Sequence, residues 1–378
     1  MPGKKLVPFL LLLVISSCTK IKQEQSQKSV EGEKVEISYA KGFSIFKSDS
    51  TVRVYFFQPF QDAQDTLVYH FTSSDNPNSI ESGRAVKYPI ESMALMSSTY
   101  AAFLDELNKI SLVKAVSNRS YFFNRAIQKG IDESQIIEVG YGQNIDFEKV
   151  IVLDPQLVLI SGMSSSEFNH YSKLSAVGIE ILPFSEWRED HPLGRAEWIK
   201  VFGVITGKLD ESLKIFAEVE KNYLESKKSV EQITENPKVI VNAPYKDIWW
   251  LPGGKSYMSI LIQDAKANYP WAEDENKGGI QSDLEAVFYQ AGDADVWINP
   301  SGYKSLEELA NLDPRFKEFN AFAEGKIFNN TLRVGPEGGN DYFESGIVRP
   351  DLVLNDFIKI FHPEFNSGHN FYFYEKLK

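Results

Sequence analysis

The 378-residue sequence contains a single cysteine, Cys18. One thiol cannot form an intramolecular disulfide or a zinc site of several thiolates, so neither feature can stabilise this protein. No lysine or arginine cluster follows the N-terminal pair Lys4 and Lys5, and the formal net charge is −12. A chain without a basic patch lacks the electrostatic feature of nucleic-acid binders. We therefore expect no nucleic-acid partner.

The N-terminal apolar run, Leu6 to Ile15, is too short to cross a membrane, which takes about 20 residues. Two lysines precede it and two serines follow it, as in a secretory signal peptide. Residues 1–17 with Cys18 resemble a bacterial lipoprotein signal, which implies that Cys18 becomes the lipidated first residue. An ordinary secretory signal with an incidental cysteine is the alternative. We predict a cell-envelope protein on the periplasmic or surface face, held to the membrane by its lipid anchor only.

Sequence motifs of catalysis are missing as well. No G-x-S-x-G elbow, P-loop, H-E-x-x-H motif or dinucleotide-binding glycine motif occurs in a suitable setting, and the five histidines lack metal-ligand spacing. We therefore expect neither enzymatic activity nor a cofactor or resident metal. His170, in a helix candidate, is either a surface histidine or a ligand to haem iron. Two other classes of protein stay open as alternatives: a cell-envelope hydrolase on a two-lobed scaffold, and a structural lipoprotein without a cleft.

A helix-then-strand pattern is present twice. Residues 146–150 (DFEKV) lead to the apolar run at 157–160 (LVLI), and residues 283–287 (DLEAV) lead to the run at 296–298 (VWI). The copies begin 137 residues apart, whereas solenoid repeats have periods of roughly 20 to 50 residues. We interpret the copies as equivalent parts of two lobes, between which a ligand usually lies.

Short apolar strands alternate with helical patterns, which predicts mainly parallel sheets covered by helices. The predicted fold class is α/β: two lobes, each a mainly parallel sheet flanked by helices, joined by one long connecting helix, with an added N-terminal β-ribbon. First-lobe strand candidates are residues 85–89, 112–116, 136–139, 157–160 and 180–183. The predicted boundaries are a signal peptide at 1–17, a flexible tether at 18–33, an N-terminal lobe at 34–206 with the β-ribbon at 34–83, a connecting helix at 207–232 and a C-terminal lobe at 233–378.

Several motifs carry a family resemblance. Residues 141–144 (YGQN), 147–150 (FEKV) and 154–160 (DPQLVLI) resemble the signature of ABC-transporter substrate-binding proteins for ferric siderophores, haem and cobalamin. Residues 249–256 (WWLPGGKS) and 341–344 (DYFE) resemble the second-lobe motifs of that family. The β-ribbon departs from the family pattern. The resemblance implies a lipid-anchored monomer that binds an iron complex or cobalamin between its lobes and delivers it to an ABC permease dimer.

The same resemblance implies ligand contacts by Tyr141, Trp250 and Asp341. Tyr141 matches a stacking aromatic residue, although an ordinary turn tyrosine fits equally well. Trp249 and Trp250 are adjacent, so in an extended segment their rings point to opposite sides. We expect Trp249 in the core and Trp250 at the ligand. Asp341 matches an acidic residue of the cleft, and a cap of the following turn is its alternative.

Four charged residues complete the set of predicted contacts. Arg188 and Arg333 lie in predicted loops, where a planar guanidinium suits a propionate or another carboxylate; a surface ion pair is the alternative for each. The resemblance implies that Glu148 and Glu285, one on each lobe, dock onto arginines of the permease. The alternative is a favourable interaction of each glutamate with the start of its helix.

Overall fold

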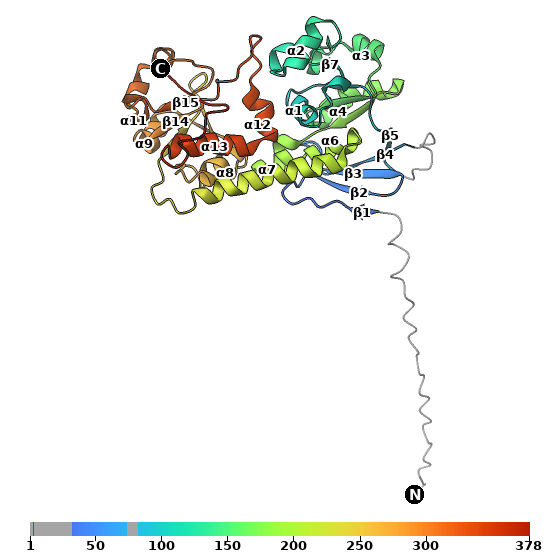
Figure 1. Ribbon diagram of the computed structural model, residues 1–378, viewed down its shortest axis with the longest axis horizontal. Helices are drawn as coiled ribbons and strands as arrows, with labels where there is room; N and C mark the ends of the chain where they lie inside the picture. The colour runs from blue at the N-terminus through green and yellow to red at the C-terminus, as the bar shows by residue number, and fades with distance from the viewer. Residues whose placement is uncertain (1–2, 4–31, 74–81) are drawn as a thin grey trace.

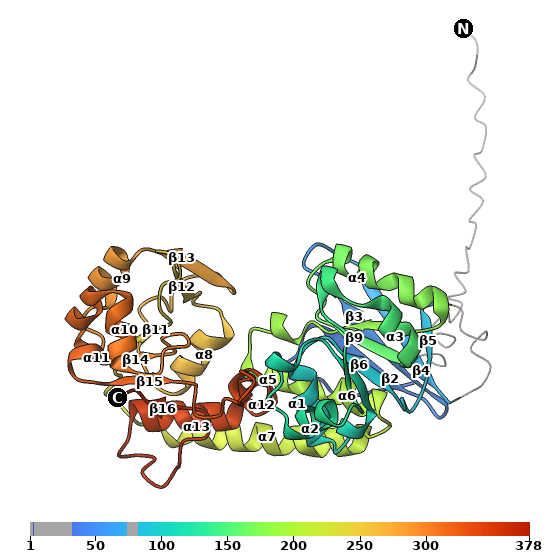
Figure 2. The same cartoon turned by 90° about the horizontal axis from the view of Figure 1, so that it is seen from above.

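The computed structural model describes Gly3, residues 32–73 and residues 82–378. The predicted signal peptide, Cys18 and nearly all of the predicted tether therefore lie outside the described residues. Two α/β lobes lie side by side, and helix α7 (Leu209–Ser229) runs along both (Figure 1 and Figure 2). The predicted fold class is confirmed. Across the described residues, no helix combines the length and apolar character needed to span a bilayer.

The strands form an N-terminal sheet and one sheet in each lobe. The N-terminal sheet, in the order β1-β2-β3-β4-β5, contains β1 (Glu33–Lys34), β2 (Phe43–Lys47), β3 (Thr51–Phe57), β4 (Thr66–Thr72) and β5 (Arg84–Lys87). The parallel first-lobe sheet, in the order β10-β9-β6-β7-β8, contains β6 (Met93–Leu95), β7 (Val113–Val116), β8 (Ile137–Glu138), β9 (Leu157–Ile160) and β10 (Glu180–Pro183). The second-lobe sheet, in the order β11-β14-β15-β16, contains β11 (Val239–Val241), β14 (Val296–Ile298), β15 (Ile327–Asn329) and the antiparallel β16 (Glu375–Lys376). Strands β12 (Trp249–Pro252) and β13 (Gly279–Ser282) pair separately.

Helices cover the sheets. The α-helices of the first lobe are α1 (Thr99–Glu106), α2 (Arg125–Asp132), α3 (Phe147–Leu153), α4 (Ser165–Tyr171), α5 (Pro192–Glu197) and α6 (Ile199–Ile205). Those that follow α7 are α8 (Tyr257–Asp264), α9 (Leu284–Ala291), α10 (Leu306–Leu312), α11 (Asn320–Ala323), α12 (Ser345–Val348) and α13 (Pro350–Phe361). Short 3-10 turns include η6 (Glu186–Arg188) and η8 (Asp341–Phe343). Helix α12 lies at the junction of the lobes, where it contacts α1, α5 and α13.

The duplicated pattern forms the same helix-then-strand unit in each lobe. Asp146 caps α3 by accepting a hydrogen bond from the backbone N–H of Lys149 at 3.0 Å. Asp283 caps α9 in the same way, from the N–H of Ala286 at 2.7 Å. A side-chain oxygen at the N-cap satisfies a backbone donor that the helix leaves unpaired. The strands that follow, β9 and β14, each pair with a strand on both sides.

Helix α7 packs on α6 of the first lobe and on α13 of the second. Its 21 residues span about 32 Å at 1.5 Å per residue. The buried face consists of Leu209, Ser212, Phe216, Val219 and Tyr223, at spacings of three and four residues. One continuous helix therefore supports both lobes.

The first-lobe sheet differs from the expectation in one respect. We expected residues 85–89 to belong to it, but β5 pairs in parallel with β4 of the N-terminal sheet. Its place is taken by β6, which lies between β9 and β7. An apolar run of three or four residues shows that a strand is present, but not which neighbour it pairs with, because pairing depends on long-range contacts.

The N-terminal sheet is fastened to the first lobe by two buried glutamates. The Glu197 carboxylate accepts hydrogen bonds from the backbone N–H groups of residues 38, 39 and 40, each at 2.8 Å. Glu189 accepts from the N–H groups of Lys41 and Gly42 at 2.8 to 3.0 Å. Lys200 pairs with Glu197 at 2.6 Å. Residues 38–42 are thus held by side chains of α5 and the turn before it.

Candidate functional site

Tyr141 lies in the loop after β8, at the carboxyl edge of the first-lobe sheet, where ligands of open parallel sheets bind. Gly140 has a φ of +79°, and a Cβ there would lie 2.3 Å from the carbonyl oxygen of Asn144, so glycine is required for this turn. The Tyr141 hydroxyl lies 3.1 Å from Ser161 Oγ and 3.3 Å from Glu167 Oε1. Partial burial raises the pKa of Tyr141. The side chain remains 38% exposed.

The loops after β9 and β10 join the same cluster. The Trp187 indole donates a hydrogen bond to the carbonyl oxygen of Ser161 at 2.7 Å. Arg188, next in sequence, donates through Nη1 to the carbonyl oxygens of Gln58 and, at 3.1 Å, of Phe60. The guanidinium is therefore fixed on the loop between β3 and β4. The N-terminal sheet thus determines where Arg188 lies.

A cavity of about 490 Å³ adjoins Arg188, with lining residues from the N-terminal sheet and both lobes. Phe57 and Thr66 belong to strands of the N-terminal sheet, Gln58 and Gln64 lie in the loop between these strands, and Lys277 belongs to the second lobe. Lys277 Nζ lies 2.5 Å from Asp190 Oδ2 of the first lobe. This ion pair connects the loop before β13 to the loop that carries Arg188.

In the second lobe, the two adjacent tryptophans point to opposite sides of β12. Trp249 is fully buried and stacks on Trp297 with 5.6 Å between ring centroids. Trp250 is 45% exposed and lies opposite Gln281 of β13. This alternation is the one expected from the pleat of a strand. Trp250 is therefore the exposed ring of the pair.

The structure brings two of the predicted contacts together. Arg333 Nε lies 2.5 Å from Asp341 Oδ2, and the Asp341 side chain is 4% exposed. The Arg333 guanidinium also lies over the rings of Phe123 and Tyr372, at 5.0 and 4.4 Å from their centroids. Asn340, and not Asp341, caps the turn η8. Asp341 thus holds Arg333 against an aromatic ring of the first lobe.

Glu344 forms another link between the lobes. The Glu344 Oε2 atom accepts a hydrogen bond from the backbone N–H of Phe123 at 2.8 Å, and Glu344 is 2% exposed. Burial raises the pKa of Glu344 to about 8, although the Phe123 hydrogen bond opposes the shift. At neutral pH this carboxyl is therefore largely protonated.

Sequence reasoning missed a buried polar cluster at the same junction. The Arg195 guanidinium lies 4.2 Å from the ring centroid of Tyr257 in α8 and donates to the carbonyl oxygens of Trp187 and Glu189. Glu186 Oε1 accepts from the Thr99 hydroxyl at 3.1 Å, whereas Oε2 is buried without a hydrogen-bond partner. Burial raises the pKa of Glu186 to about 7. The contacts of Arg195 with Tyr257 and of Glu186 with Thr99 join residues far apart in the sequence, so no local pattern could have indicated them.

The raised pKa values of Glu186 and Glu344 predict that the stability of the protein depends on pH. An unfolded glutamate has a pKa of about 4.3, so the folded protein holds more protons than the unfolded chain between about pH 4.3 and 8. Because the native state binds the extra protons, the free energy of unfolding falls as pH rises through this window. Each pKa unit corresponds to about 1.4 kcal/mol. We expect unfolding in urea, measured from pH 5 to 9, to show a loss of a few kcal/mol.

Glu344→Gln tests this assignment because glutamine keeps the oxygen that accepts from Phe123 and cannot ionise. The variant should show a shallower slope and exceed the wild type in stability at pH 9. Glu231→Gln, at an exposed position, is the matched control and should leave the slope unchanged. An unaltered slope in Glu344→Gln would refute the role of Glu344.

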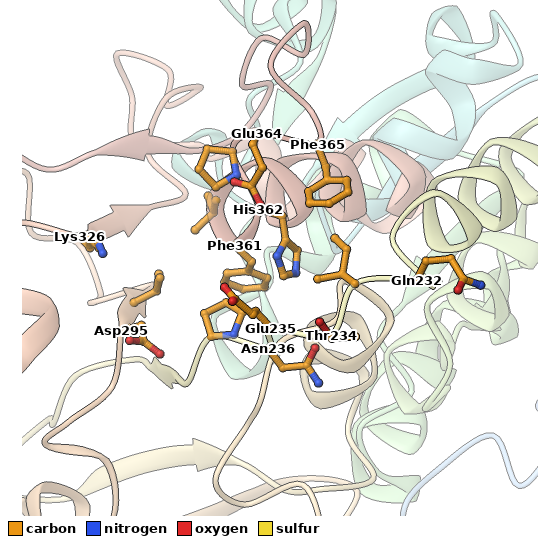
Figure 3. A pocket seen from close by; sticks show the side chains of 15 residues that line it. Gln232, Thr234, Glu235, Asn236, Asp295, Lys326, Phe361, His362, Glu364 and Phe365 are labelled. Carbon is orange, nitrogen blue, oxygen red and sulfur yellow. The ribbon is translucent and has the colours of Figure 1, made fainter.

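A second cavity, of about 590 Å³, lies on another face of the second lobe (Figure 3). Asp295 and Lys326 line it, and they precede β14 and β15. The cavity is therefore at the amino ends of these strands. Ligands of open parallel sheets lie at the carboxyl ends, so this cavity is not the candidate ligand site.

The predicted docking glutamates both lie on the surface, on different lobes. Glu148 is in the first turn of α3. Glu285 is in the first turn of α9, where its carboxylate lies 2.7 Å from Arg315 Nη1. Arg315 also pairs with Asp313 at 2.6 Å. Exposure fits both interpretations of the glutamates, since a helix start and a docking contact each place them at the surface.

His170 lies in α4 and packs on α3. Its Nε2 is buried without a hydrogen-bond partner, and the ring packs against Phe147 at 5.1 Å between centroids. Within residues 32–73 and 82–378, no three histidine, cysteine, aspartate or glutamate side chains are grouped to hold a metal ion.

This chain is similar to known proteins in its sequence and in its fold. The sequence profile of the periplasmic binding protein family matches residues 94–331. An uncharacterized lipoprotein of Methanocaldococcus jannaschii is 28% identical over 303 residues, which cover 78% of this chain and 70% of that protein.

Two solved structures show the same architecture. A periplasmic binding protein from Veillonella parvula superposes with a TM-score of 0.61 at 11% identity, covering 83% of this chain and 99% of the other. A periplasmic heme binding protein from Pseudomonas aeruginosa gives a TM-score of 0.54 at 14% identity, covering 73% of this chain and 94% of the other. With the family profile matched across residues 94–331 and this two-lobed fold, the chain belongs to the periplasmic binding protein family.

Proposed function

We propose that this protein captures an iron complex or cobalamin at the junction of its lobes and delivers it to an ABC importer. The observation that carries the proposal is an exposed aromatic ring on each lobe: Tyr141 is 38% exposed and Trp250 is 45% exposed. Aromatic faces bind large planar ligands by stacking. The heme binding protein of Pseudomonas aeruginosa, which has the same fold, supports this class of ligand.

The charged groups of the junction suit a ligand with carboxylates. Arg333 is held by Asp341 and Phe123, and its side chain keeps 37% exposure. Arg188 lies beside the cavity that Lys277 also lines. A guanidinium held in place loses little conformational entropy when it binds a carboxylate. Haem propionates and the carboxylates of many iron chelators are ligands of this kind.

The proposed anchor is a lipid on Cys18, which would leave a mature chain with 38 basic and 52 acidic residues, a charge of −14. Two Methanocaldococcus jannaschii relatives named as lipoproteins support it. Mass spectrometry of the mature N-terminus tests the anchor.

Ligand titration with two ring deletions tests the binding proposal. Haemin, cobalamin and ferric siderophores are each added to the purified protein while tryptophan fluorescence is recorded. We expect saturable quenching by one class. Stacking on an aromatic ring contributes about 1–3 kcal/mol, so Tyr141→Ala and Trp250→Ala should each weaken binding roughly tenfold, at about 1.4 kcal/mol per decade.

Circular dichroism verifies that both variants are folded. Tyr289→Ala, at an exposed ring on the outer helix α9, is the control and should bind with normal affinity. Wild-type affinity in both ring deletions would exclude stacking. Failure of all three ligand classes to quench the wild type would contradict the proposed function.

A further inference from the structure

The N-terminal sheet contributes a wall to the cavity of about 490 Å³ beside Arg188. Gln58 and Gln64 line the cavity from the loop between β3 and β4. The matched family profile begins only at residue 94, so this wall precedes it in the chain. The volume lies within the range of about 300–1,000 Å³ that is typical of ligand pockets. The cavity can therefore hold part of a ligand against a surface that the two lobes alone do not provide.

Short series of contacts connect the cavity to both aromatic rings of the proposed ligand site. On the first lobe, Trp187 precedes the arginine and donates to the carbonyl oxygen of Ser161, whose hydroxyl lies 3.1 Å from that of Tyr141. On the second lobe, Lys277 lines the cavity two residues before β13. Strand β13 pairs with β12, the strand that carries Trp250. The cavity therefore borders the proposed ligand site on both lobes.

Positive charge is in excess around the cavity, although the whole chain has a formal net charge of −12. Three cations and two carboxylates line it: Lys41, Arg188, Lys277, Glu189 and Asp190. The two lysines share Asp190, at 3.8 and 2.5 Å. The Glu189 carboxylate accepts from backbone N–H groups of the segment before β2. Neutral carbonyl oxygens hold Arg188, so the positive charge of its guanidinium is available to an anion.

The loop between β3 and β4 places two amide side chains beside this charge. Gln58 has a φ of +46°, in the left-handed region, and its carbonyl oxygen accepts from Arg188. Its Nε2 atom donates to Gln64 Oε1 at 2.8 Å, which leaves the amide nitrogen of Gln64 outside this bond. An amide N–H and a guanidinium both donate to carboxylate oxygens. On an iron chelate or a corrinoid, the group that fits these donors is a free carboxylate.

We propose that the N-terminal sheet forms a third wall of the ligand site, where Arg188 binds a free carboxylate of the ligand and Gln58 and Gln64 select for it. This inference rests on the proposed function and deepens it, because it names the ligand class and assigns its selection to a sheet outside the matched profile. Both glutamines are exposed, so their side chains can be changed without altering the core.

Pairs of probes that differ in a free carboxylate test the selection. The pairs are haemin and haemin dimethyl ester, cobalamin monocarboxylic acid and cobalamin, and ferric citrate and ferrioxamine B. Each probe is titrated against the purified protein at low salt while tryptophan fluorescence is recorded. In the class that binds, we expect the carboxylate member to bind about tenfold more tightly, and the difference to shrink in 1 M salt, which screens charge.

Substitutions of Gln64 assign the selection to the sheet. Gln64→Glu places a like charge beside the bound carboxylate and should weaken that probe about tenfold, whereas its partner should change less than about twofold. Gln64→Lys adds a positive charge and should bind the carboxylate probe at least as tightly as the wild type does. Gln61→Glu makes the same charge change at an exposed position of the same loop, outside the cavity lining, and should bind both probes normally.

Each result decides the inference separately from the proposed function. If Gln64→Glu binds the carboxylate probe normally and Tyr141→Ala binds it weakly, the inference is overturned and the proposed function stands. Equal weakening of both members of a pair by Gln64→Glu would show that the loop does not select the carboxylate, and would also overturn it. Tighter binding of the member without a carboxylate would do the same. Failure of every probe to bind the wild type would overturn both.

Discussion

Uptake should be abolished when Glu148→Arg and Glu285→Arg are combined, while the affinity for the ligand stays normal. Both glutamates are exposed and lie in the first turns of equivalent helices, α3 and α9. If arginines of the permease receive them, each substitution places like charges opposite one another, which costs several kcal/mol. Glu285→Arg also places a cation beside Arg315, now 2.7 Å from the Glu285 carboxylate.

The experiment compares uptake by cells that carry the wild type or the double variant, with the lipoprotein present at equal levels. The competing interpretation is that each glutamate only stabilises the start of its helix, by about 0.3–1 kcal/mol. In that case the variant melts slightly lower and still transports. Glu231→Arg, at an exposed position outside the repeats, is the charge-matched control. Normal uptake by the double variant would eliminate docking through these glutamates.

Glu197→Ala should destabilise the protein by roughly 3–5 kcal/mol, the usual cost of removing one partner of a buried ion pair. Glu197 is fully buried, and its carboxylate binds three backbone N–H groups of residues 38–40 together with Lys200. The variant leaves these donors without their acceptor. Because they fasten the N-terminal sheet, we expect that sheet to exchange amide hydrogens faster than the lobe sheets. Urea unfolding and native-state hydrogen exchange measure the two effects.

Glu197→Gln provides a graded comparison, because the amide keeps one acceptor oxygen but loses the charge that pairs with Lys200. It should fall between the wild type and the alanine variant. Glu231→Ala is the surface control, with an expected change within about 0.5 kcal/mol. A free energy of unfolding for Glu197→Ala within 1 kcal/mol of the wild type would show that the carboxylate does not fasten the sheet.

Local sequence patterns determined the elements that depend on neighbouring residues. Each repeat predicts a helix followed by a strand, and the structure has α3 before β9 and α9 before β14, with Asp146 and Asp283 as the helix caps. The pleat of a strand accounts for the opposite orientations of Trp249 and Trp250. The sequence predicts a long connecting helix at residues 207–232, and α7 spans Leu209–Ser229. Each of these inferences uses contacts within a few residues of the chain.

Tertiary structure decided which residues meet. Arg333 and Asp341 were separate candidates in the sequence, and folding pairs them beside Phe123, more than 200 positions earlier. Arg195 reaches Tyr257 across the lobe junction, and Glu344 reaches the backbone of Phe123. Such contacts follow from how the lobes and the N-terminal sheet pack, and that packing depends on the burial of many apolar side chains together. A periodic pattern specifies which face of an element is buried, but it does not identify the surface that covers that face.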